Sequence, residues 1–214
     1  QIKTCAVKSH TYMLYFNSLN QSGNDPTGDV RVRQAISYAI DADALVEAVW
    51  GGYADVRNQF GVGDFFYSDK VTGYEYNPEK AKELLAEAGY ADGFTIPLKA
   101  SGDSTAMKNA ATIIAQYLAE VGITCDIQML SGADFSNAEA GWGEGMLLNG
   151  SSVYVSVPMQ MLIFRKDVDG HVIGLTNLDR TEDVDAAIAA AVSAASDEEA
   201  AEYIGEGHHL LSDQ

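Results

Sequence analysis

The stretch that decides the fold lies between residues 77 and 129 and reads NPEKAKELLAEAGYADGFTIPLKASGDSTAMKNAATIIAQYLAEVGITCDIQM. It opens with Asn77 in the position of a helix N-cap and Pro78 in the first helical turn, and Gly89 provides a stop signal. The apolar residues between them recur at helical spacing, which predicts a helix from Pro78 to Gly89. The positions on its apolar face are Ala81, Leu84, Leu85 and Ala88.

A strand, a second helix and a second strand are predicted next. Apolar and polar residues alternate from Phe94 to Lys99, as in a half-buried strand, and Pro97 within it suggests an edge strand or an irregularity. A long apolar stripe then ends at Gly122, and a second alternation runs from Ile123 to Met129. The stripe consists of Met107, Ala110, Ile114, Tyr117, Leu118 and Val121.

The residues before this stretch predict one strand and two helices. The aromatic-rich residues 11–17 are typical of a buried strand. A helix follows Asp29, a second helix begins after Asp41, and Gly51-Gly52 ends it. Residues 53–76 lack a sustained period and are expected to form a long ordered loop.

The residues after it continue the same pattern. Residues 146–148 predict a short strand, and residues 157–164 are compatible with a helix or a strand. The tail predicts two helices, one with the apolar stripe of residues 184–192 and one that starts at a capping box formed by Ser196 and Glu199. We therefore expect an α/β fold with a mixed sheet and helices packed on it. Residues 1–214 are treated as a single domain with a terminal helical pair at about residues 181–212.

Composition narrows the possible functions. The chain has 214 residues, of which 47% are hydrophobic, so it can bury a core. Its 31 acidic and 13 basic residues give a net charge of −18, which repels phosphate backbones and anionic lipids, so no nucleic-acid partner is expected. No apolar stretch reaches the roughly 20 residues of a transmembrane helix. The start at Gln1, without the pattern of a secretion signal, suggests a mature or excised fragment.

No catalytic or metal-binding motif stands out. The G-x-S-x-G elbow and the complete phosphate-binding glycine motifs are missing, so we expect no enzymatic activity and no cofactor. His208 and His209 are adjacent and would point about 100° apart on a helix, so no metal site is expected. Cys5 and Cys125 have no metal-ligand spacing, and they are either buried thiols or a disulfide.

The order of motifs resembles family 5 of the extracellular solute-binding proteins, the oligopeptide and dipeptide receptors of ABC importers. The resemblance covers most of residues 12–130 and is thin beyond them. Its motifs are Tyr15-Phe16-Asn17, the run DVRVRQAISYAID at 29–41, Gly51-Gly52-Tyr53-Ala54, the run YEYNPEKAKELLAEAGY at 74–90, Asp92-Gly93-Phe94, and the segment from Gln116 to Ile123.

This resemblance implies one lobe of a periplasmic-binding-protein-like receptor of the class II type. Receptors of this family have two lobes that close on a solute, and the matching region is the second lobe. The implied partners are a small solute or peptide, the first lobe of the same receptor and an ABC permease. The implied location is extracytoplasmic, as a cell-surface lipoprotein or in the periplasm, with membrane contact only through a lipid anchor outside this chain. The alternative is the solute-sensing lobe of a regulatory or signalling protein.

The resemblance also points to a candidate binding wall. Peptide receptors of the family carry a Trp and an Asp after the strand near Met146, and the aligned positions here are Ser151 and Tyr154. A Trp expected before Phe135 is replaced by Gly132. Without the acid, free-amine peptides are expected to bind poorly unless another carboxylate substitutes. The candidate ligand-binding residues are Asn149, Ser151, Ser152, Tyr154 and Ser156, and an ordinary surface loop is the alternative.

Overall fold

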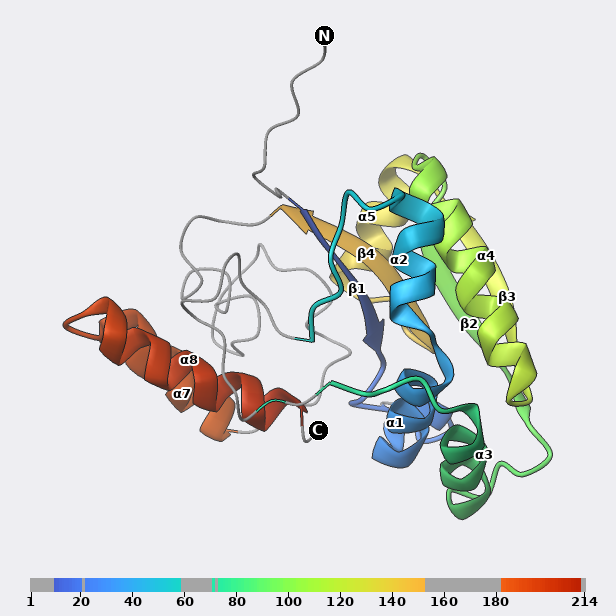
Figure 1. The fold of residues 1–214 in the computed structure, drawn as a ribbon, viewed down its shortest axis with the longest axis horizontal. Coiled ribbons are helices and arrows are strands. Elements are labelled where there is room, and N and C mark those ends of the chain that lie inside the picture. The colour runs from blue at the N-terminus through green and yellow to red at the C-terminus, as the bar shows by residue number, and fades with distance from the viewer. Residues whose placement is uncertain (1–9, 21, 59–70, 72, 153–181, 213–214) are drawn as a thin grey trace, which may run out of the picture.

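A four-stranded mixed sheet forms the centre of the molecule in the computed structural model (Figure 1). The structure describes residues 10–20, 22–58, 71, 73–152 and 182–212. The strands lie in the order β1-β4-β2-β3, and β1 alone runs antiparallel to its neighbour. Their bounds are β1 His10–Phe16, β2 Phe94–Ser101, β3 Ile123–Leu130 and β4 Met146–Ser152.

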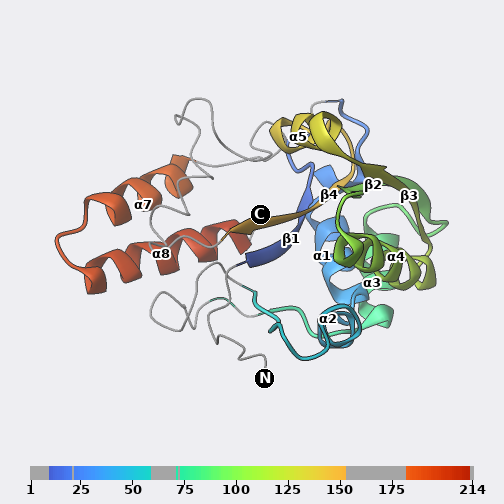
Figure 2. The same cartoon turned by 90° about the horizontal axis from the view of Figure 1, so that it is seen from above.

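The parallel strands place helices on both faces of the sheet. Helix α4 (Thr105–Glu120) connects β2 to β3, and helix α5 (Gly132–Ala140) connects β3 to β4. The first connection steps outward to the edge of the sheet, and the second steps back past β2. Because such crossovers are right-handed, a reversal of direction requires the opposite face. Figure 2 shows α5 and α4 on opposite sides of the sheet.

Alternation along the strands divides the core into two clusters. On β4, Met146 and Leu148 belong to the cluster on the α4 side, whereas Leu147 belongs to the cluster on the α5 side. On β1, Phe16 and Tyr15 divide in the same way. The central strands are therefore buried from both faces, as expected of a sheet covered by helices on each side.

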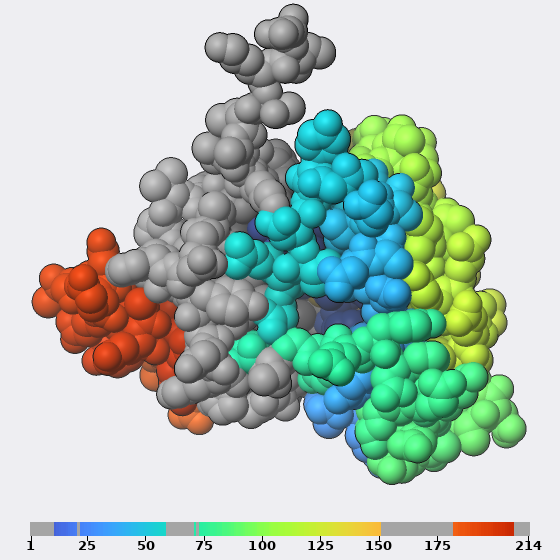
Figure 3. Space-filling view, in the orientation of Figure 1, coloured from blue at the N-terminus to red at the C-terminus, as the bar shows by residue number. Residues whose placement is uncertain are grey.

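Four helices cover the face of the sheet on the α4 side. They are α1 (Val30–Ala39), α2 (Ala42–Trp50), α3 (Pro78–Glu87) and α4. The predicted cap of α3 is confirmed, since the Asn77 side chain accepts a hydrogen bond from Lys80 N at 2.9 Å. Gly51 ends α2 in the left-handed conformation, which glycine adopts without steric cost. Figure 3 shows α2 and the segment before α3 hiding much of the sheet on this side.

The second cluster includes residues of the C-terminal helices α7 (Glu182–Ser193) and α8 (Asp197–Ser212). The predicted capping box at Ser196 and Glu199 is present, except that the Glu199 side chain accepts from the backbone of Ala195 and not from that of Ser196. Glu199 N donates to Ser196 Oγ at 3.2 Å, and the Glu199 carboxylate accepts from the N–H of Ala195 at 2.8 Å. The cluster itself consists of Tyr15, Ala138, Trp142, Leu147, Val184, Ile188, Ala191 and Ile204.

A buried carboxylate ties β1 to β4. Asp25 precedes the short 3-10 helix η1 (Pro26–Gly28) and is 7% exposed. It accepts hydrogen bonds from Asn17 Nδ2 at 2.8 Å, Gly145 N at 2.6 Å, and the Thr27 N and Oγ1 at 3.0 and 2.7 Å. Since Asn17 follows β1 and Gly145 precedes β4, Asp25 holds the two ends of this strand pair together.

Two expectations differ from the structure. The edge position considered for the strand containing Pro97 is wrong, because β2 is an interior strand with β3 and β4 as neighbours. The ladder to β4 contains only Leu98 to Ala100, so Pro97 lies outside it and no ladder hydrogen bond to β4 is lost. Helix α5 was not predicted, since its sequence has only a short apolar face made by Phe135 and Ala138.

The remaining predictions have mixed outcomes. The described residues between α2 and α3 form no helix or strand, as predicted. Cys125 is a half-buried free thiol, so the disulfide alternative is not realised, and Cys5 lies outside the described residues. Burial raises the pKa of the Cys125 thiol to about 11. The segment 157–164 also lies outside the described residues.

Candidate functional site

The candidate wall begins in the last half of β4. Asn149, Ser151 and Ser152 pair with Met13, Thr11 and His10 of β1 in the antiparallel ladder. Tyr154 and Ser156 lie outside the described residues. The carboxyl end of β4 lies at the same edge of the sheet as the ends of its parallel neighbours β2 and β3. Ligands of open α/β sheets bind at this edge, so the position suits a binding wall.

Asn149 lies inside the protein at the boundary between β4 and α5. Its side chain is 3% exposed, and its Nδ2 donates a hydrogen bond to Glu139 Oε1 at 3.1 Å. Strand alternation places Asn149 on the same face as Leu147, toward α5. Asn149 therefore orients a carboxylate of α5, a role that its position in the sequence did not reveal.

Tyr15 lies on the same face of the sheet. It is 6% exposed, and its hydroxyl is buried without a hydrogen-bond partner among the described residues. Burial raises the pKa of Tyr15 well above its usual range, and the negative charge of Glu139 raises it further. Tyr15 and Asn149 are thus buried polar side chains on the α5 face of the sheet, and Asn149 is hydrogen-bonded to Glu139 of α5.

A different environment occupies the other face at the same end of the strands. Gly150 lies directly opposite Tyr12, whose ring stacks on Trp50 of α2 with a centroid distance of 4.9 Å. A Cβ atom at Gly150 would approach the Tyr12 ring to 2.6 Å, so the absence of a side chain leaves room for this stack. Tyr12 remains 38% exposed, which leaves an aromatic surface at the start of β1.

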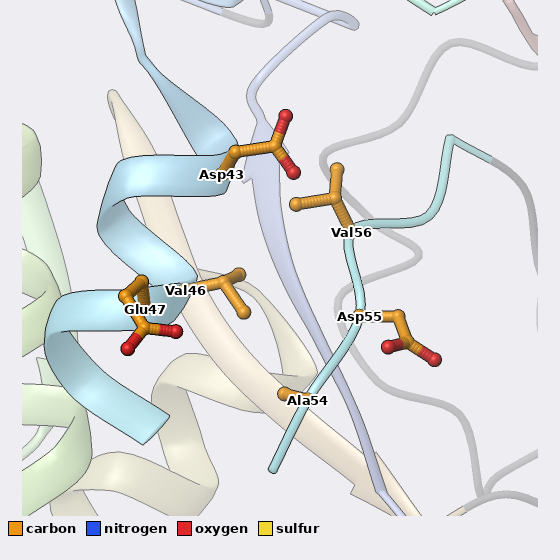
Figure 4. Close-up of a pocket in the computed structure, with 6 residues that line it drawn as sticks. All are labelled: Asp43, Val46, Glu47, Ala54, Asp55 and Val56. Atoms are coloured by element: carbon orange, nitrogen blue, oxygen red, sulfur yellow. The ribbon is translucent and has the colours of Figure 1, made fainter. Parts of the chain in front are cut away.

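A shallow hollow of about 500 Å³ lies between α2 and the loop that follows it (Figure 4). In Figure 4 the side chains of Val46 and Val56 point toward each other across the hollow, and Asp55 points away from α2. Carboxylates and small apolar groups dominate the lining, which disfavours anions. The lining residues are Asp43, Val46, Glu47, Ala54, Asp55 and Val56.

The described residues contain no cluster of three or more His, Cys, Asp or Glu side chains that could hold a metal ion. Within the same ranges, no helix is both long and apolar enough to span a bilayer. The ion pair of Asp29 with Arg31, at 2.5 Å, lies at the N-terminus of α1 and is partly exposed to solvent. The side-chain hydrogen bond from Arg31, together with the backbone cap bond, holds the pKa of Asp29 below its usual range, a shift that this ion pair explains without catalysis.

Comparison with known protein families agrees with the α/β lobe. Residues 3–168 match the middle part of the bacterial extracellular solute-binding proteins, family 5. The chain belongs to this family. Members of the family bind solutes outside the cytoplasm, so the prediction of a binding protein rather than an enzyme is confirmed at the family level. The alternative of a regulatory sensing lobe is not favoured.

Individual relatives match this chain over only part of their own length. The chain is 34% identical over 125 residues to a glutathione-binding protein GsiB of Pectobacterium atrosepticum, covering 58% of this chain and 24% of the relative. It is 39% identical over 108 residues to a dipeptide-binding protein of Escherichia coli, covering 48% of this chain and 20% of the relative. The matched region thus spans a quarter or less of these curated relatives.

Solved structures share the fold over nearly the whole chain. The periplasmic binding protein DppA of Helicobacter pylori, in complex with the peptide STSA, superposes with a TM-score of 0.82 at 22% identity and covers 96% of this chain and 40% of that one. A mannohexaose-bound oligopeptide-binding protein of Thermotoga maritima also gives 0.82, at 17% identity, and covers 97% and 43%. The predicted periplasmic-binding-protein-like fold is confirmed.

Proposed function

We propose that this chain is the ligand-binding lobe of an ABC-importer receptor that captures peptides or peptide-like solutes without catalysis. The observation that carries this proposal is the family match over residues 3–168. It is supported by the relatives named for glutathione and dipeptides, which are themselves peptides. The chain would supply one wall of a cleft, and a first lobe in the same receptor would supply the other.

Binding would proceed by closure of the two lobes around the solute. The affinity would then depend on the population of the closed form as well as on direct contacts. The closed form would present both lobes to an ABC permease, and a lipid anchor outside this chain would hold the receptor at the membrane. The net charge of −18 is compatible with this extracytoplasmic role.

The wall that we assign to this lobe consists of Asn149, Ser151, Ser152, Tyr154 and Ser156. Its first three members lie at the carboxyl end of β4, where α/β sheets bind ligands. Ligand class needs a direct test, because one structural neighbour is bound to a tetrapeptide and another to a hexasaccharide.

The test is a thermal-shift screen of the complete two-lobed receptor. The ligands are di- to hexapeptides, their N-acetylated forms and oligosaccharides. A ligand present at 100 times its Kd stabilises the folded protein by about 2.7 kcal/mol. We expect such stabilisation from a subset of peptides. Stabilisation by oligosaccharides alone would contradict the peptide assignment, and no stabilisation by any ligand would contradict the receptor role.

A further inference from the structure

Four tyrosine rings meet in two pairs on the α4 side of the sheet, and we call them the tyrosine patch. Tyr38 of α1 and Tyr74 form a T-shaped pair with a centroid distance of 5.0 Å. Tyr76 and Tyr117 of α4 form a second T-shaped pair at 5.7 Å. In such a pair the edge of one ring meets the face of the other, so at least one ring of each pair keeps both faces clear of its partner.

The patch is held in place and remains exposed. Tyr74 and Tyr76 belong to the irregular segment before α3, and the N–H of Asn77 donates to the carbonyl oxygen of Tyr38 at 2.8 Å. This bond fixes the segment against the end of α1. Tyr74 is 39% exposed and Tyr76 is 42% exposed, and Figure 3 shows the segment before α3 on the surface. Tyrosine rings offer a partner a large contact area at a low cost in conformational entropy.

Carboxylates surround the exposed rings. Glu120 follows Tyr117 by three residues on α4, which places the two side chains on one face of the helix. Glu79 lies in the first turn of α3, three residues after Tyr76, and Asp41 caps α2. Partial desolvation raises the pKa values of Tyr76 and Tyr117, and the charges of Glu120 and Asp41 raise them further. The rings therefore lie in a negative electrostatic field.

The patch lies at the edge of the sheet opposite the proposed wall. Tyr117 is in the last turn of α4, and β3 follows this helix directly. Because β3 and β4 both run parallel to β2, the start of β3 and the carboxyl end of β4 lie at opposite edges. A partner at the patch and a solute at the wall can therefore bind at the same time.

An arginine side chain has the chemistry that fits this patch. Its guanidinium group stacks on aromatic faces, and its fork of N–H donors pairs with carboxylates. Small solutes favour pockets that enclose most of their surface, whereas an open aromatic surface suits a segment of a partner protein. A second copy of this chain is disfavoured as that partner, because each copy carries a net charge of −18.

We propose that the tyrosine patch docks an arginine-bearing segment of a partner protein. Tyr76 supplies the stacking surface, and Glu120 supplies a carboxylate that pairs with the guanidinium group. This inference goes beyond the proposed function and does not depend on it, because the patch and the wall lie at opposite edges of the sheet.

The experiment is isothermal titration calorimetry of the complete receptor. The probe is an N-acetylated, C-amidated heptapeptide of alternating glycine and arginine, and the same peptide with lysine in place of arginine tests the stacking. The test variants are Tyr76→Ser and Glu120→Gln. The second variant keeps every ring, so it tests the patch even if Tyr76→Ser disturbs the segment before α3. The matched controls are Tyr203→Ser and Glu202→Gln, at exposed positions of α8.

We expect the wild-type receptor to bind the arginine peptide more tightly than the lysine peptide, because an ammonium group has no planar face to stack. Tyr76→Ser should weaken binding of the arginine peptide by about 5-fold, which corresponds to about 1 kcal/mol. Glu120→Gln should weaken it by about 2-fold, since an exposed ion pair contributes less. Both control variants should bind like the wild type, and added salt should weaken binding.

Three results would overturn the inference. If both test variants bind the arginine peptide as tightly as the wild type, the peptide binds elsewhere, and the proposed function still stands. If the lysine peptide binds equally well, or the control variants weaken binding as much as the test variants, the general acidity of the surface accounts for binding. If the arginine peptide does not bind at all, the docking role fails, whereas the thermal-shift screen decides the proposed function separately.

Discussion

Replacing Asp25 with alanine should destabilise the fold by about 3–5 kcal/mol. The change leaves the buried N–H groups of Thr27 and Gly145 without their acceptor, and each such loss costs about 1–3 kcal/mol. Asn17 also loses one hydrogen bond, whereas the Thr27 hydroxyl keeps the Asn17 carbonyl oxygen at 3.4 Å. The loss of the two backbone acceptors together with the Asn17 hydrogen bond gives the expected total of about 3–5 kcal/mol.

This loss is large against a typical domain stability of about 5–15 kcal/mol. It is measured by urea unfolding, with the fluorescence of the buried Trp142 as the signal, because its indole N–H donates to the carbonyl of Gly145 beside the network. The control is Asp92→Ala, at an exposed acid. A loss below about 1 kcal/mol for Asp25→Ala, or one equal to the control, would refute the reasoning.

Three further predictions concern other parts of the fold. Gly150→Ala should displace the Tyr12 ring from Trp50 and cost about 1 kcal/mol in unfolding free energy, and unchanged tryptophan emission would contradict it. Asp29→Ala removes the N-cap of α1 and should cost about 0.5–2 kcal/mol. Because the folded pKa of Asp29 is lowered, first by the side chain of Arg31, this cost should be full at pH 7 and shrink as pH falls through that pKa; a difference in urea melts that stays constant with pH would contradict this. The folded pKa of Cys125 is raised to about 11 from 9.0, so the folded state keeps a proton that the unfolded state releases, and stability should fall between these pH values. Cys125→Ala should make that fall shallower, and an equally steep fall would show that another group causes it.

Most of the helices and strands could be predicted from the sequence because their signals are local. Asn77, Pro78 and Gly89 mark a helix whose observed bounds are Pro78–Glu87. The alternation that begins at Phe94 corresponds to β2, and the one that begins at Ile123 corresponds to β3. In each case the cap, the stop and the apolar period lie within a few residues of one another.

The failures involve contacts that are distant in the sequence. Pro97 suggested an edge strand, but the position of β2 depends on where β4 returns to the sheet. Helix α5 has a short apolar face, and its only local signal is Ser131 followed three residues later by Asp134. No local signal therefore indicated that Glu139 of this helix lies beside Asn149.

The sequence by itself determined the α/β class, the order of the elements and the family, because periodicity, caps and motifs are properties of short segments. It also led to the prediction of a binding wall at the end of β4. Only the tertiary structure decided which side chains share that place. Asn17, Asp25 and Gly145 meet because β4 pairs with β1 across more than a hundred residues of chain. Glu139 reaches Asn149 because a right-handed return crossover puts α5 on the face opposite α4. Hydrogen bonds between distant segments depend on this packing, which no local pattern encodes.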